Sequence, residues 1–137
     1  MSNENKTLSA RQATAMILPE DEVLAAQFRE RLHKLIASGN HVTMSISPNI
    51  EAKVCLEFNT GNRSLNETVI KRYASDMRRN HWLNSGEPII FSQEGILNDG
   101  QHRLYACIEA GVPFVADLRF GIDRSAFTEI IGQGTNR

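Results

Sequence analysis

The stretch GILNDGQHRLYACIEAG, residues 95–111, decides how this chain folds. Its apolar ILN segment predicts a short strand that runs directly into Asp99 and Gly100. Apolar residues then recur at helical spacing, namely Leu104, Cys107 and Ile108. This periodicity predicts a helix over residues 101–110, with Gly111 as its C-terminal cap. The stretch therefore predicts a strand, a glycine turn and a helix in immediate succession.

Further strands and helices are predicted on both sides of this stretch. The segments PIIFS (residues 88–92) and ILN form a hairpin around a Gln-Glu-Gly turn, and PFVADLRF (residues 113–120) predicts a strand after the helix. Upstream, apolar residues mark one face of a helix that ends near Asn80: Val69, Ile70, Tyr73, Ala74 and Met77. Before that helix, alternation over residues 42–46 predicts a strand, and Ser47-Pro48 begins a helix that runs to about Phe58.

The N-terminal part of the chain predicts a helical extension. Residues 1–9 are expected to be a polar, disordered tail, and residues 20–38 form an amphipathic helix that ends at Gly39. Docking of this helix on the domain is the favoured interpretation, and a dimerisation helix, which would make the protein a homodimer, is the alternative. We therefore divide the chain into an N-terminal tail and helix (residues 1–40) and a folded domain (residues 41–137).

The order of these elements predicts an α+β fold, with a small mixed sheet, packed helices and an N-terminal helical extension. A doubly wound sheet is not expected, because the strands are few and short.

Composition excludes several classes of protein. The chain has 137 residues, 41% of them hydrophobic, and its net charge of −1 does not indicate general nucleic-acid binding, although local basic patches remain compatible with it. No apolar run is long enough to span a bilayer and the N-terminus lacks a signal-peptide hydrophobic region, so we expect no membrane partner and a cytoplasmic location. Cys55 and Cys107 lie in apolar helical patterns, which favours buried free thiols over a disulfide or a zinc site.

The glycine turn before the helix is a candidate anion site. A strand, a tight glycine turn and a helix N-terminus recur at phosphate sites, because amides of the first turn point outward and the helix dipole adds positive charge. His102 and Arg103 would add donors, and Gln101 could donate or accept. A carboxylate at Asp99 repels phosphate unless a divalent cation bridges them, or it acts as a base. In the alternative interpretation, Asp99 caps the helix, and His102 and Arg103 are surface groups.

A second cluster of charge lies in KRYASDMRRNH, residues 71–81. Its basic residues and aromatic ring could contact a nucleic-acid backbone. The basic residues fall largely opposite the apolar face of the same helix, so a solvated face is the favoured interpretation; they are Lys71, Arg72, Arg78 and Arg79.

Residues 88–121 resemble the core of the ParB/sulfiredoxin-like superfamily. The shared features are a Pro-Ile strand, a second strand, a helix start led by glycine with an arginine after it, and a following Val-Pro strand. The resemblance covers about residues 42–137 and is strongest to phage and bacterial ParB-like proteins of unassigned role.

The resemblance implies that the glycine-led helix start holds nucleotide phosphates. ParB partition proteins bind CTP with magnesium there, and free serine kinases of the superfamily carry Asp-Gly-His-His-Arg. Regulators of DNA phosphorothioation carry an Asp-Gly-Gln-His-Arg string like that of Asp99–Arg103. ATP or CTP with Mg²⁺ would thus be held by Gly100, Gln101, His102 and Arg103. Sulfiredoxins have their catalytic cysteine where this chain has Gln101, so sulfiredoxin activity is not expected.

Two flanking motifs would complete the site in this resemblance. Asn62 and Arg63 precede the middle helix, where ParB-like proteins often place an arginine near the ligand. Arg137, at the end of a Thr-Asn-Arg string, falls where ParB proteins carry a second phosphate-contacting motif. The helix-turn-helix module of true ParB proteins would follow this point and is not present in the sequence.

The leading hypothesis from the sequence is a ParB-like domain of phage or plasmid DNA biology that binds an NTP. It would hydrolyse the NTP, use it as a conformational switch or transfer its phosphoryl group. Asp99 and His102 would be its catalytic residues, Asp99 would also orient the metal, and the activity would be that of an NTPase or a kinase. The alternatives are a DNA-binding or nuclease-like accessory protein and a non-catalytic interaction module.

Overall fold

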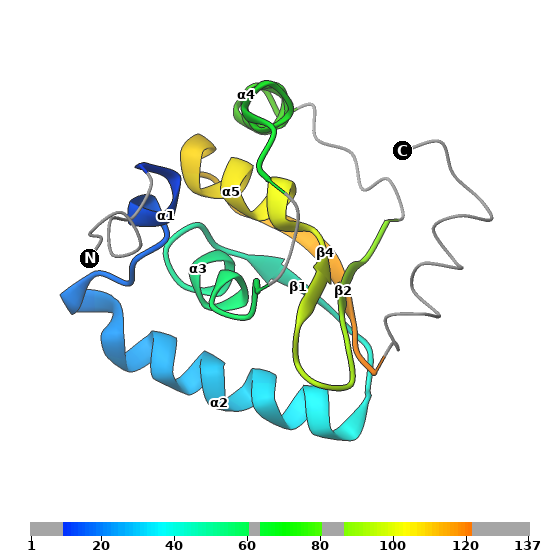
Figure 1. The fold of residues 1–137 in the computed structure, drawn as a ribbon. Coiled ribbons are helices and arrows are strands. Elements are labelled where there is room, and N and C mark those ends of the chain that lie inside the picture. The colour runs from blue at the N-terminus through cyan, green and yellow to red at the C-terminus, as the bar shows by residue number, and fades with distance from the viewer. Residues whose placement is uncertain (1–9, 61–63, 81–86, 122–137) are drawn as a thin grey trace, which may run out of the picture.

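A computed structural model describes residues 10–60, 64–80 and 87–121. Within these ranges the protein has the expected mixed α+β fold, with helices packed around a small four-stranded sheet (Figure 1). No helix of the described part is long and apolar enough to cross a membrane.

The elements follow in chain order (Figure 1): α1 (Ala10–Thr14), the 3₁₀ turn η2 (Pro19–Asp21), α2 (Glu22–Ser38), β1 (Val42–Ile46), α3 (Glu51–Leu56), α4 (Glu67–Arg78), β2 (Ile89–Phe91), β3 (Leu97–Asp99), α5 (Gln101–Ala110) and β4 (Phe114–Arg119).

The sheet has the strand order β1-β4-β2-β3. Strands β2 and β4 run parallel, and the two outer pairs are antiparallel. Along β4, buried residues alternate with more exposed ones, so Phe114, Ala116 and Leu118 face the core. This period-two pattern means that one side of β4 receives the helices, while Val115 and Arg119 on its other side are exposed.

Helix α5 is the central helix of the domain. It packs against both α3 and α4, and α2 packs in turn on α3 (Figure 1). Leu104 and Cys107 of α5 are fully buried in the same core as Phe91 and Leu118 of the sheet. Apolar residues of α2 also belong to this core, as docking of that helix on the domain predicts; they are Ala25, Phe28 and Leu32.

Most of the predicted elements are present, with two differences. Helix α3 begins at Glu51 and not at Ser47-Pro48, because residues 48–50 form a turn in which Ser47 Oγ accepts the amides of Ile50 and Glu51. Helix α1 was not predicted, since five residues with no buried side chain carry no apolar periodicity. The expected short helix from Asp123 lies outside the described residues, as does the tail of residues 1–9.

The turn between β3 and α5 requires glycine at position 100. Gly100 has a φ of 123° and is the N-cap residue of α5. A Cβ at this position would lie 3.1 Å from both Cγ1 and Cγ2 of Ile89. The chain therefore reverses directly against β2, with a backbone conformation that L side chains rarely adopt.

We expect Gly100→Ala to lower the free energy of unfolding by about 2–3 kcal/mol, because it adds crowding against Ile89 to the backbone strain. Gly39→Ala is the matched control: Gly39 also has a positive φ, 74°, but a Cβ there meets no atom within 4 Å. That change should cost only about 1 kcal/mol. Urea denaturation measures both, and equal losses would contradict the close approach at Ile89.

Candidate functional site

The N-terminus of α5 is the candidate site, and its N-cap residue is a glycine. The N-cap residue is Gly100, which has no side-chain acceptor, and the first turn contains no acidic residue. Asp99 is the last residue of β3, and its Oδ2 lies 3.7 Å from Nη2 of Arg103. Gly100, and not Asp99, is therefore the N-cap residue of α5, and the Asp99 carboxylate forms an ion pair with Arg103.

Arg103 points into the protein toward the start of β2. Its side chain is buried, Nη1 donates to the carbonyl of Glu87, and Nη2 donates to the carbonyl of Pro88 at 3.0 Å. These two carbonyls immediately precede β2, so the guanidinium holds the first residues of that strand against α5. A phosphate could reach this side chain only through N–H groups other than these two.

His102 holds the start of α4. The backbone N–H of Asn66 donates to Nε2 of His102 at 2.9 Å, which requires a neutral imidazole with its proton on Nδ1. Asn66 is the N-cap residue of α4, and its own side chain accepts the amide of Val69. His102 is thus a positioning residue for α4, and its Nε2 already accepts a hydrogen bond from the backbone N–H of Asn66.

Gln101 holds the segment that follows α3. Its side chain is buried, and its Oε1 accepts a hydrogen bond from Nδ2 of Asn59 at 2.9 Å. The neighbouring carbonyl of Phe58 accepts the amide of Leu97 in β3 at 2.7 Å. The segment after α3 is therefore fixed to both β3 and α5.

Three successive side chains of α5 thus hold three different segments. Neighbouring helical residues point about 100° apart, so Gln101, His102 and Arg103 reach in three directions from one turn. The segments that they hold flank the start of α5 at residues 59, 66 and 87–88. The predicted site residues Gly100 to Arg103 are adjacent as expected, whereas Asn62, Arg63 and Arg137 lie outside the described residues.

The acidic residues of the described ranges form no protein-only metal site. No group of three His, Cys, Asp or Glu side chains comes together there in a way that could hold an ion. Mg²⁺ commonly takes one or two carboxylates together with phosphate oxygens of its substrate. The single carboxylate of the Asp99–Arg103 segment fits that mode only with a phosphate ligand present.

The two cysteines are buried free thiols, as the sequence predicted. Burial raises the pKa of both thiols, that of Cys107 to about 12. The Sγ of Cys107 donates toward the carbonyls of Ile46 and Val112 inside the core. Neither thiol therefore provides a thiolate nucleophile at neutral pH.

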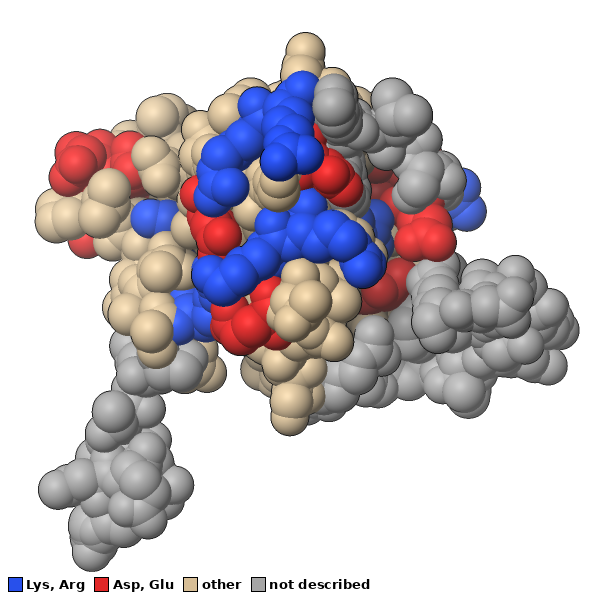
Figure 2. Space-filling model, turned by 90° about the horizontal axis from the view of Figure 1, so that it is seen from above, with Lys and Arg blue, Asp and Glu red and all other residues tan. Residues whose placement is uncertain are grey.

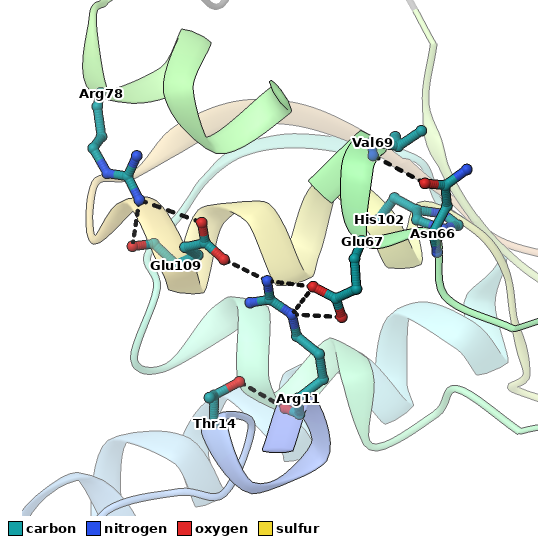
Figure 3. A network of polar contacts seen from close by, with 8 residues as sticks. All are labelled: Arg11, Thr14, Asn66, Glu67, Val69, Arg78, His102 and Glu109. Atoms are coloured by element: carbon teal, nitrogen blue, oxygen red, sulfur yellow. Dashed lines mark hydrogen bonds and ion pairs between the residues drawn. The ribbon is translucent and has the colours of Figure 1, made fainter. Parts of the chain in front are cut away.

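An ionic network that the sequence did not reveal adjoins the start of α4 (Figure 3). Arg11 of α1 donates through Nη2 to Glu67 at 2.8 Å and to Glu109 of α5. Arg78 of α4 approaches the same Glu109 at 3.5 Å. One cation thus joins α1 to α4 and α5, next to Asn66, which contacts His102 (Figure 3).

The hydrogen bonds from Arg11 lower the pKa of the Glu67 and Glu109 carboxyls. Nothing in the sequence signalled this network, because its members are separated by 56 and 98 positions along the chain. Only the packing of α1 brings Arg11 between the two carboxylates.

The chain matches no model of a known protein family, and neither the curated proteins nor the solved structures include a match. Its function must therefore be inferred from the chemistry of its own residues.

We expect Arg11→Gln to weaken the acid sensitivity of folding. A carboxyl whose pKa is lowered by folding stabilises the protein above its unfolded pKa of about 4.3, and this stabilisation is lost as the pH falls through the folded pKa. Without Arg11, stability at neutral pH should fall, and its decline below about pH 5 should be shallower. Urea denaturation across this pH range measures both effects.

Lys34→Gln is the control for that experiment, because Lys34 pairs only distantly, at 3.8 Å, with the exposed Glu30. It should leave the pH dependence unchanged. A wild-type pH profile in Arg11→Gln would show that the network does not hold the two carboxyls in solution.

We expect His102→Ala to speed hydrogen exchange at the Asn66 amide about fivefold, the change that corresponds to one hydrogen bond of about 1 kcal/mol. His102→Gln is the matched variant, since its side-chain oxygen can accept the same N–H. Exchange measured by NMR should therefore stay close to wild type in His102→Gln. Equal acceleration in both variants, or in neither, would contradict the positioning role.

Proposed function

We propose that this protein is a nucleotide-binding domain that holds the phosphates of an NTP at the N-terminus of α5. The observation that carries the proposal is the glycine N-cap: the N-cap residue has no side-chain acceptor of its own, and the first turn of α5 contains no acidic residue. Such a start attracts an anion through its amides and the helix dipole. The resemblance of residues 88–121 to the ParB/sulfiredoxin-like superfamily supports the same location.

In this proposal the backbone binds the phosphates and the side chains shape the site. Gly100 lets the helix start lie against Ile89, in a backbone conformation that L side chains rarely adopt. Gln101, His102 and Arg103 hold the surrounding segments in place through the contacts with Asn59, Asn66 and Pro88. The preformed arrangement lowers the cost of ordering the site when the ligand binds.

Magnesium enters this proposal as a companion of the bound triphosphate. Asp99 would hold it together with phosphate oxygens, and the ion would neutralise the charge of those oxygens next to the carboxylate.

Nucleotide-dependent switching fits the geometry better than phosphoryl transfer. A ligand at the start of α5 would lie beside the segments that lead into α4 and β2. Binding of its phosphates could therefore change the conformation of these segments. His102 and Arg103 are engaged with backbone groups, which leaves their side chains poorly placed to act on a reacting phosphate. Hydrolysis and transfer would each need a further group that positions a water or an acceptor.

Site-resolved titration tests this proposal. In ¹⁵N-labelled protein, the amides of residues 101–104 should shift in a saturable way with the magnesium complexes of ATP, CTP or GTP, and tripolyphosphate should compete. The first turn of α2 is an internal control, because Glu22 and the acids of η2 make that helix start repel anions.

No saturable shift, or equal shifts at both helix starts, would overturn the proposal. Binding of a nucleoside without competition by tripolyphosphate would also overturn it, since the site would then recognise the base. Arg103→Ala is a poor probe of phosphate binding, because it also leaves the carbonyls of Glu87 and Pro88 without their donor.

A further inference from the structure

Helix α4 forms an outer ridge of the molecule. Its inner side carries the buried residues Ile70, Ala74 and Met77, and it packs on α5 (Figure 1). Viewed from above, over α4, Lys and Arg side chains gather across the middle of the surface, with acidic side chains beside them (Figure 2). Within the described residues, the outer side of α4 thus carries exposed side chains.

Four exposed cations lie on this outer side in two rows. Residues seven apart overlie one another on a helix, so Lys71 lies in line with Arg78, and Arg72 lies in line with Arg79. The members of each row are about 10 Å apart along the helix axis, from a rise of about 1.5 Å per residue. Between the rows lies Ser75, whose hydroxyl can also donate to a phosphate.

The acids beside these rows are largely compensated by another cation. Glu67 and Glu109 flank the Lys71–Arg78 row, and both accept hydrogen bonds from Arg11. Arg78 donates to the backbone carbonyl of Glu109 at 3.4 Å and lies 3.5 Å from its carboxylate, and the Arg78 side chain remains half-exposed. On the other flank, the half-buried Asp76 lies beside Arg72 and Arg79 and reduces the net positive charge.

We propose that the outer face of α4, formed by Lys71, Arg72, Ser75, Arg78 and Arg79, docks on the phosphate backbone of duplex DNA. Charge complementarity carries this assignment: along the helix axis, the Lys71/Arg72 pair lies about 10 Å from the Arg78/Arg79 pair. A helix that crosses a B-form major groove, which is about 12 Å wide, can therefore place one pair at the phosphates on each side of the groove.

The same face fits other nucleic acids less well. Single strands are bound by stacking on exposed aromatic rings, but Tyr73 is half-buried and Arg72 lies over its ring at 5.6 Å. The major groove of A-form RNA is too narrow for a helix. The docking surface uses none of residues 99–103, so the inference does not depend on the proposed nucleotide site.

Fluorescence anisotropy with a labelled duplex, across a series of salt concentrations, tests the inference. If all four cations contact phosphates, the slope of log K against log salt concentration should be about −3.6. Arg72→Gln/Arg79→Gln should bring the slope to about −1.8 and weaken binding at every DNA sequence alike. Thermal melting of each variant reports whether the fold is intact.

The matched control is Arg31→Gln/Lys34→Gln on the exposed side of α2, at the opposite end of the molecule from α4 (Figure 1). It removes the same two charges and should leave both slope and affinity unchanged. Equal weakening in the two double variants would overturn the inference, because net charge alone would then explain binding. Absence of salt-dependent binding by wild type, or tighter binding of single-stranded DNA or duplex RNA, would overturn it as well.

Discussion

The close approach of the chain at Gly100 to Ile89 is the constraint on which the domain depends. Because this residue has no Cβ, β3 can reverse into α5 directly against β2, with Ile89 3.1 Å from where a Cβ would lie. The reversal places the first turn of α5 at the centre of the fold. From there, side chains that point in different directions reach the segment after α3, the start of α4 and the start of β2. The glycine thus sets the position of α5, whose first turn contacts these three segments.

The N-terminal segment contributes charge as well as apolar contact. Arg11 lies between the carboxylates of Glu67 and Glu109, which would otherwise stand together beside the outer face of α4. Its hydrogen bonds lower the pKa of both carboxyls and keep them ionised. Because Arg11 pairs with these carboxylates, they neutralise less of the positive charge on the outer face of α4. A chain with a net charge of −1 can in this way present a helix face that carries four exposed cations.

The polar residues after Gly100 are consecutive in the sequence, yet each contacts a different segment of the folded protein. Polar side chains clustered at a helix start suggest a ligand site. In the folded protein, however, Arg103 and His102 form hydrogen bonds with backbone groups of other segments. Such contacts and a ligand site are compatible, since a phosphate held by amides needs the surrounding segments to be fixed. In the proposed function, the helix dipole and the glycine N-cap, more than the side chains, would attract an anion to the start of α5.

The sequence by itself determined the elements whose signals are local. Period-two alternation marked β1, helical periodicity marked α5, and the glycine that ends α5 caps it in the left-handed conformation. The delayed start of α3 was not predicted, because Ser47 caps a turn that precedes the helix. Only the tertiary structure decided that Arg103 faces the carbonyls before β2 and that Arg11 joins α1 to α4 and α5. Both depend on segments far apart in the chain, and hydrogen-bond partners at such separations leave no periodic trace in the sequence.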